Sequence, residues 1–131
     1  MKLLTLLTII LATTIMANAQ KKEAPKRNAA PMLRHVVLFK FKDGTSAEDV
    51  KKVEDAFRGL PKLIKEIKSF EFGTNNSPEN LNQGFTHCFF VTFTNEKDRE
   101  IYLPHPAHKA FGAVLKPFLD KVLVIDYWAG K

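Results

Sequence analysis

The stretch FTHCFFVTFTN, residues 85–95, is rich in aromatic and β-branched side chains, and such runs form β-strands. Alternate residues of a strand point to opposite faces of the sheet. One face would carry Phe85, His87, Phe89, Val91 and Phe93, and the other Thr86, Cys88, Phe90 and Thr92. An antiparallel sheet with one face in water should alternate apolar and polar residues, so both faces of this strand are expected to be covered.

Three other stretches predict strands of the same character. They are HVVLFKFK (residues 35–42), IKSFEFGTN (67–75) and KVLVIDYW (121–128). In the last of them, Val122, Val124, Asp126 and Trp128 share one face, and Leu123, Ile125 and Tyr127 the other. Large apolar groups therefore stand on both faces here as well.

Helical patterns separate these strands. Thr45 or Ser46 predicts an N-cap, and the apolar stripe that follows predicts a helix ending between about residue 58 and residue 65, where Gly59 and Pro61 weaken it. Asn95 predicts the cap of a short helix running through about Leu103. A second apolar stripe predicts another helix after a proline break, and it consists of Ala107, Phe111, Val114 and Phe118.

The order strand, helix, strand, strand, helix, strand predicts an α+β fold. It is the ferredoxin-like split β-α-β arrangement, with an antiparallel four-stranded sheet and the helices on one face. The helices can cover only that face. The other face is apolar and needs a partner, most simply the same face of a second copy, so we expect a homodimer that forms a dimeric α/β-barrel.

Residues 1–19 predict a secretory signal peptide. Lys2 precedes a charge-free apolar run, and Ala17-Asn18-Ala19 offers a cleavage site of small residues. The apolar run is about 14 residues long, shorter than the roughly 20 of a membrane-spanning helix. We therefore expect an extracytoplasmic protein, periplasmic or secreted, with no stable membrane insertion after cleavage.

Residues 20–32 predict a flexible linker, because they are rich in Ala, Pro, Lys and Asn without periodicity. Residues 33–131 then form a single domain. The formal net charge of the whole chain is +6, but arginines and aromatics are not interleaved, so no nucleic-acid partner is expected. The single cysteine, Cys88, excludes an internal disulfide.

The stretch YLPHPAHKAFG, residues 102–112, carries the candidate chemistry. Pro104 predicts the end of one helix, and Pro106 suits the first turn of the next. His105 then falls near the N-cap and His108 near the third helical position. The positive potential of a helix N-terminus disfavours an imidazolium, so His108 is expected to be a neutral general base. Tyr102 is expected to donate a hydrogen bond to a developing enolate.

Four segments together resemble the stress-responsive dimeric α/β-barrel (Dabb) family. They are RHVVLFKFKDG (34–44), FTHCFFVTF (85–93), YLPHPAHKAFG and LVIDYW (123–128). The resemblance implies a ferredoxin-like subunit whose sheet pairs with that of a second subunit. The family includes a plant polyketide cyclase in which a tyrosine and a histidine of this motif carry the chemistry. The positions here that match that cyclase are Tyr102, His108, His35, Asp126 and Arg34, where Arg34 replaces a lysine.

Two function hypotheses follow. In the first, the protein is a cofactor-independent lyase or cyclase acting on a small, largely apolar, carbonyl-bearing molecule. Tyr102 and His108 would be catalytic, and the substrate-binding residues would be His35, Asp126, His105 and Arg34. No metal is expected, because Pro106 disturbs the face shared by His105 and His108 and there is no compact acidic cluster.

In the second hypothesis, the protein is a non-catalytic stress-response or ligand-binding protein. His108 would then cap a helix, Tyr102 would be a core residue with a satisfied hydroxyl, and Asp126 would pair with a basic residue. A cavity lined by Tyr102, His108 and His35 would favour chemistry. A filled core with His108 bonded to backbone would favour the second hypothesis.

Overall fold

The computed structural model describes residues 30–130. Within them the chain forms four strands and three helices, and each corresponds to an element that the sequence predicts. The strands are β1 (Leu33–Phe41), β2 (Ser69–Thr74), β3 (His87–Phe93) and β4 (Leu119–Trp128). The helices are α1 (Ala47–Leu63), α2 (Glu96–Tyr102) and α3 (Pro106–Leu115). The predicted signal peptide and most of the predicted linker lie outside the described residues.

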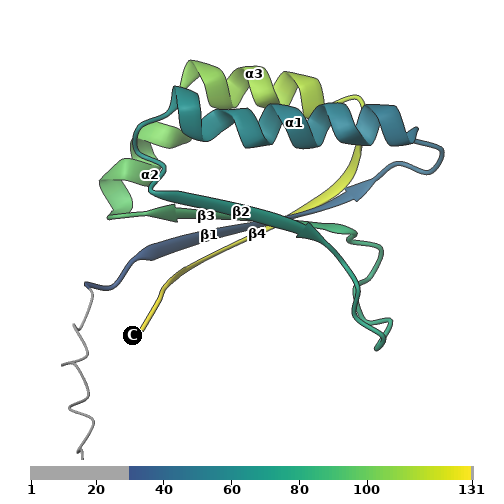
Figure 1. Cartoon of the computed structure of the whole chain (residues 1–131), viewed down its shortest axis with the longest axis horizontal. Coiled ribbons are helices and arrows are strands. Elements are labelled where there is room, and N and C mark those ends of the chain that lie inside the picture. The colour runs from purple at the N-terminus through teal and green to yellow at the C-terminus, as the bar shows by residue number, and fades with distance from the viewer. Residues whose placement is uncertain (1–29, 131) are drawn as a thin grey trace, which may run out of the picture.

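The strands form one antiparallel sheet in the order β2-β3-β1-β4. All three helices lie on the same face of this sheet (Figure 1). The predicted α+β, ferredoxin-like fold is therefore confirmed. Among the helices of the described region, none has the length and apolar character needed to cross a membrane.

The core lies between the sheet and the helices, and phenylalanines dominate its centre. The ring of Phe57 on α1 lies 4.5 Å from that of Phe89 on β3 and 4.5 Å from that of Phe111 on α3, measured between centroids. Phe39 on β1 contacts all three of these rings. This cluster fixes α1 and α3 over the middle of the sheet, so the space beside it is bounded by rigid elements.

The first helix begins where the sequence predicts and ends at Leu63, within the predicted range. Ser46 is the N-cap, and its Oγ accepts a hydrogen bond from the Asp49 N–H at 3.1 Å. Pro61 stands inside the last turn instead of ending the helix. The turn still closes, because the Ile64 N–H donates to the Leu60 carbonyl at 2.9 Å.

The double proline separates two helices, as the sequence predicts. Tyr102 is the last residue of α2, and Pro106 is the first of α3. His105 is the N-cap of α3, where its Nδ1 accepts a hydrogen bond from the Ala107 N–H at 3.1 Å. Tyr102 and the first turn of α3 therefore lie at the two ends of one short connection.

The sheet face opposite the helices is apolar, and no described element covers it (Figure 1). We call it the outer face. On β4, Leu123, Ile125 and Tyr127 point to this face and are 41%, 50% and 46% exposed. Leu38 and Cys88 lie on it in the neighbouring strands and are half-buried. The predicted two-sided apolar character of the sheet is present.

Candidate functional site

A cavity of about 310 Å³ lies between the sheet and the helices, beside the phenylalanine cluster. Four polar side chains line it, contributed by β1, α2, α3 and β4: His35, Tyr102, His108 and Asp126. The remaining wall is almost entirely apolar. An apolar wall with a few convergent polar groups is typical of small-molecule sites.

Tyr102 lines this cavity and carries a buried hydroxyl. The residue has no exposed surface, and within the described part of the chain its hydroxyl has no hydrogen-bond partner. Burial raises the pKa of the Tyr102 phenol far above its ordinary value, so the group stays protonated and able to donate. Its ring centroid lies 4.3 Å from that of His108 and 5.7 Å from that of His35.

His108 occupies the third position of α3, as predicted, and its ring is held by the backbone. Its Nδ1 lies 2.9 Å from the carbonyl oxygen of Leu103. A carbonyl can only accept, so Nδ1 carries the hydrogen and donates it. In the neutral form of the ring the lone pair is therefore on Nε2, which is the tautomer that a base at this position requires.

His35 is oriented by a carboxylate. The β1–β4 register places it directly opposite Asp126, and its Nδ1 lies 2.6 Å from Oδ1 of that residue. Nδ1 donates to the carboxylate, which again leaves Nε2 as the free nitrogen. Only 5% of His35 is exposed, and this burial lowers its pKa even though Asp126 raises it. His35 is thus a neutral imidazole at pH 7.

Arg99 is a member of this group that sequence reasoning missed. Its Nη1 donates to Oδ2 of Asp126 at 2.8 Å. Arg99 lies three residues before Tyr102 on α2, and residues at that spacing share a helix face. That spacing could have pointed to Arg99 as a neighbour of Tyr102. It is a weak signal, because exposed faces of amphipathic helices carry many arginines.

Two of the predicted substrate-binding residues do not reach the cavity. Arg34 precedes His35 on β1 and so points to the outer face, where it donates to Thr92 Oγ1 and lies over the Phe90 ring at 5.4 Å. His105 caps α3 and lines a separate surface groove. Neither residue lies in the cavity with Tyr102. Arg34 faces the other way because neighbouring residues of a strand point to opposite faces of the sheet.

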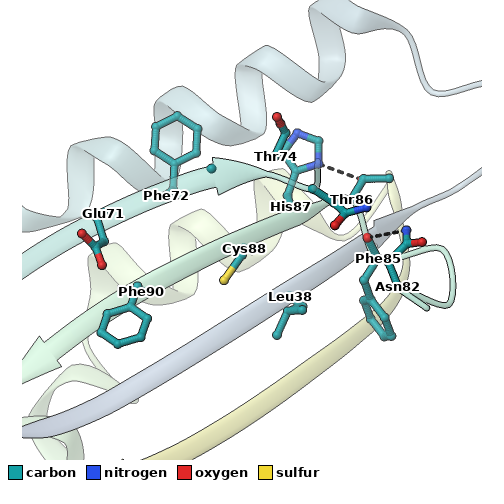
Figure 2. A pocket seen from close by; sticks show the side chains of 12 residues that line it. Leu38, Glu71, Phe72, Thr74, Asn82, Phe85, Thr86, His87, Cys88 and Phe90 are labelled. Carbon is teal, nitrogen blue, oxygen red and sulfur yellow. Dashed lines mark hydrogen bonds between the residues drawn. The ribbon is translucent and has the colours of Figure 1, made fainter. Parts of the chain in front are cut away.

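The fourth histidine, His87, also lies apart from this group. Its Nε2 is 3.0 Å from Oε1 of Glu54. Figure 2 shows its surroundings, where Phe72 and His87 point toward the helices and Cys88 and Phe90 to the outer face. The hollow there has a volume of about 360 Å³ and contains none of the four polar groups of the first cavity. The described residues contain no group of three or more side chains able to hold a metal ion.

The fold and this cavity define a class: a small ferredoxin-like domain with two imidazoles and a phenol in one pocket between sheet and helices. Sequence comparison assigns the family. Residues 33–129 match the stress responsive A/B barrel domain, Dabb. The chain belongs to this family, as the resemblance predicted.

Named relatives support the assignment. The stress-response A/B barrel domain-containing protein HS1 of Arabidopsis thaliana is 43% identical over 95 residues, which cover 72% of this chain and 87% of that protein. Olivetolic acid cyclase of Cannabis sativa is 30% identical over 95 residues, covering 72% and 94%. A crystal structure from Bacteroides fragilis, described as dimeric, ferredoxin-like and of unknown function, has a TM-score of 0.62 at 30% identity, covering 74% and 95%.

Proposed function

We propose that this chain is an exported, homodimeric protein that binds a small, largely apolar, carbonyl-bearing molecule and acts on it as a cofactor-independent lyase or cyclase. One observation carries the proposal. The buried Tyr102 hydroxyl has no hydrogen-bond partner among the described residues, and Tyr102 lines the same cavity as His35 and His108. A buried polar group left unpaired is costly, and such groups are characteristic of functional sites.

The chemistry follows from the two catalytic groups. Nε2 of His108 would take a proton from the carbon next to the substrate carbonyl, and the electron pair of that C–H bond would form an enolate. The Tyr102 hydroxyl would donate a hydrogen bond to the enolate oxygen, where the negative charge develops. In a cyclase the enolate carbon then attacks a second carbonyl of the same molecule. That carbonyl oxygen takes a proton, which the His108 imidazolium supplies.

His35 and Asp126 would bind the substrate from the opposite wall. His35 offers Nε2 to a hydroxyl or enol of the ligand, and Asp126 holds the ring in that orientation. The apolar wall would take an alkyl or aryl portion, and it includes Phe39, Phe111 and Leu115. The name of olivetolic acid cyclase, a 30% identical relative, agrees with a cyclisation reaction.

Assembly as a dimer is part of the proposal. The outer face is apolar, and covering it with a second copy would remove its exposed side chains from water. The 30% identical Bacteroides fragilis protein is described as dimeric. Export rests on residues 1–19 alone, and N-terminal sequencing of native protein should find a mature chain that begins at Gln20. Native protein that retains these residues would contradict export.

Exchange of carbon-bound hydrogen tests the enzyme proposal without knowledge of the natural substrate. Acetophenone is a small, apolar ketone whose methyl hydrogens exchange slowly in neutral D₂O. The protein should accelerate this exchange, and His108→Ala and Tyr102→Phe should each reduce the acceleration at least about 100-fold. Lys97→Met, which changes an exposed lysine on α2, is the control and should be as active as wild type. Absence of acceleration by the wild type would contradict catalysis of enolisation.

One observation favours a second candidate, a non-catalytic ligand-binding protein. Nδ1 of His108 donates to the Leu103 carbonyl, which also suits a purely structural role at the start of α3. In that case acetophenone would bind in the cavity, but its hydrogens would exchange no faster than in buffer. Binding and exchange measured on the same sample therefore separate the two candidates.

A further inference from the structure

Three side chains from three elements form a continuous chain of charge-assisted hydrogen bonds behind the cavity. Arg99 on α2 donates to Oδ2 of Asp126 on β4 at 2.8 Å. The other oxygen of that carboxylate, Oδ1, accepts from Nδ1 of His35 on β1 at 2.6 Å. Each carboxylate oxygen thus has one strong donor, and the carboxylate cannot rotate without losing both.

We infer that Arg99 is a positioning residue that locks Asp126 and offsets part of its charge, which supports the neutral imidazole, with a free Nε2, that the buried His35 presents to the cavity. The guanidinium remains charged at every relevant pH, so this compensation is permanent. The use of His35 toward a substrate rests on the proposed function. The electrostatic effect of Arg99 on His35 does not, and it can be measured in the ligand-free protein.

The groups that face His35 come from every neighbouring element. Burial is the largest influence and disfavours the imidazolium, the hydrogen bond and charge of Asp126 favour it, and the like charge of Arg99 makes a smaller contribution against it. Tyr102 on α2 and Phe93 on β3 contact the ring without carrying charge. Because burial outweighs the attraction of Asp126, the pKa of His35 lies below its ordinary value. Without Arg99, the attraction of the carboxylate for the imidazolium would be opposed chiefly by burial.

The Arg99–Asp126 ion pair is less exposed than an ordinary surface ion pair. Its side chain is 24% exposed and that of Asp126 is 30% exposed, whereas the Arg58–Asp55 pair on α1 is 53% and 51% exposed. Arg99 also connects α2 to β4, because its partner Asp126 lies 27 residues later in the sequence. Partial burial reduces screening by water, so the guanidinium acts more strongly on the neighbouring His35.

Titration of the His35 ring by NMR tests the inference in ligand-free protein. In Arg99→Met the protonation midpoint of His35 should rise, because the attraction of Asp126 for the imidazolium is then no longer offset by the guanidinium. Arg99→Lys keeps a cation and should move the midpoint back toward wild type. Lys97→Met removes the same charge from an exposed site on the same helix and should leave the midpoint unchanged.

A midpoint that stays at the wild-type value in Arg99→Met would overturn the inference, even if the variant melts at a lower temperature. Such a result would mean that the Arg99–Asp126 ion pair stabilises the fold without affecting the protonation of His35. Should Arg99→Met fold poorly, Arg99→Gln can replace it, because it retains a donor for Asp126 without the charge. A higher protonation midpoint of His35 in this variant would support the inference, and an unchanged midpoint would overturn it. Failure of the acetophenone exchange would contradict the proposed enzyme but would leave this titration unaffected.

Discussion

The two hypotheses differ in the role of one atom, the hydroxyl oxygen of Tyr102. It is free to bind a ligand in the first hypothesis and has a structural hydrogen-bond partner in the second. The Tyr102 ring packs between Phe93 and His108 and needs no hydroxyl for that packing. Removing the oxygen in Tyr102→Phe deletes one unpaired buried group, and leaving such a group unpaired costs roughly 1–3 kcal/mol. The free energy of unfolding of Tyr102→Phe should therefore equal that of wild type or exceed it by up to about 2 kcal/mol.

Chemical denaturation of both proteins measures this difference. The same variant should lose exchange activity, which gives a stable but inactive protein. A Tyr102→Phe variant that is clearly less stable than wild type would show that the hydroxyl has a structural partner, as the second hypothesis requires.

His35 makes the stability of the fold depend on pH. Its pKa in the folded protein lies below the ordinary value of about 6.5 of the unfolded chain, so the unfolded state takes up the proton first. Stability is therefore fully present above about pH 6.5 and falls as the pH is lowered toward the folded-state pKa. Melting temperatures between about pH 7.5 and pH 5 check this. His35→Gln should give a shallower decline, and an equal slope would contradict the assignment to His35.

Single positions also show how far sequence can predict the site. Tyr102, His108, His35 and Asp126 were expected together, and they line one cavity. Arg34 was expected there through family resemblance, but it alternates with His35 along β1 and so belongs to the opposite face. Nothing in the sequence reveals that a helix arginine reaches a strand aspartate 27 residues later, because that contact depends on how α2 packs against β4.

The elements themselves were predictable because each has a strong local signal. Alternation marks the strands, and Ser46, Asn95 and His105 are caps at the expected positions. Pro61 lies inside the last turn of α1, where a proline removes little of the hydrogen bonding of a helix, and the helix ends at Leu63, within the predicted range. Pairing partners could be inferred only from the fold, and the direct pairing of His35 with Asp126 follows from the order of β1 and β4.

The cap of α3 provides a test at the level of an element. Nδ1 of His105 satisfies the Ala107 N–H, so His105→Ala should lower the free energy of unfolding by about 1 kcal/mol. His105→Asn replaces the imidazole nitrogen with a capping oxygen and should restore most of the lost free energy of unfolding. Neither variant should change the affinity for acetophenone, because His105 lies outside the cavity. A loss of affinity in both variants, measured by NMR titration, would return His105 to the substrate-binding residues.

At the scale of the whole molecule, the proposed dimer depends on the apolar outer face. Ile125→Lys or Leu38→Glu places a charge on it, and burying an unpaired charge costs several kcal/mol. We expect either change to yield monomers or to prevent folding, as seen by light scattering. Leu81→Glu, in the exposed loop before β3, is the matched control and should remain dimeric. A wild-type protein that is monomeric at micromolar concentration would contradict the proposed dimer.

The central claim is that Tyr102, His108 and His35 form one ligand pocket, and an NMR titration with acetophenone tests it most directly. The ring signals of His35 and His108 should shift together and saturate together, while those of His87 and His105 stay in place. Tyr102→Phe should weaken this response. Shifts confined to His87 or His105, or no saturable shift at His35 and His108, would contradict the account.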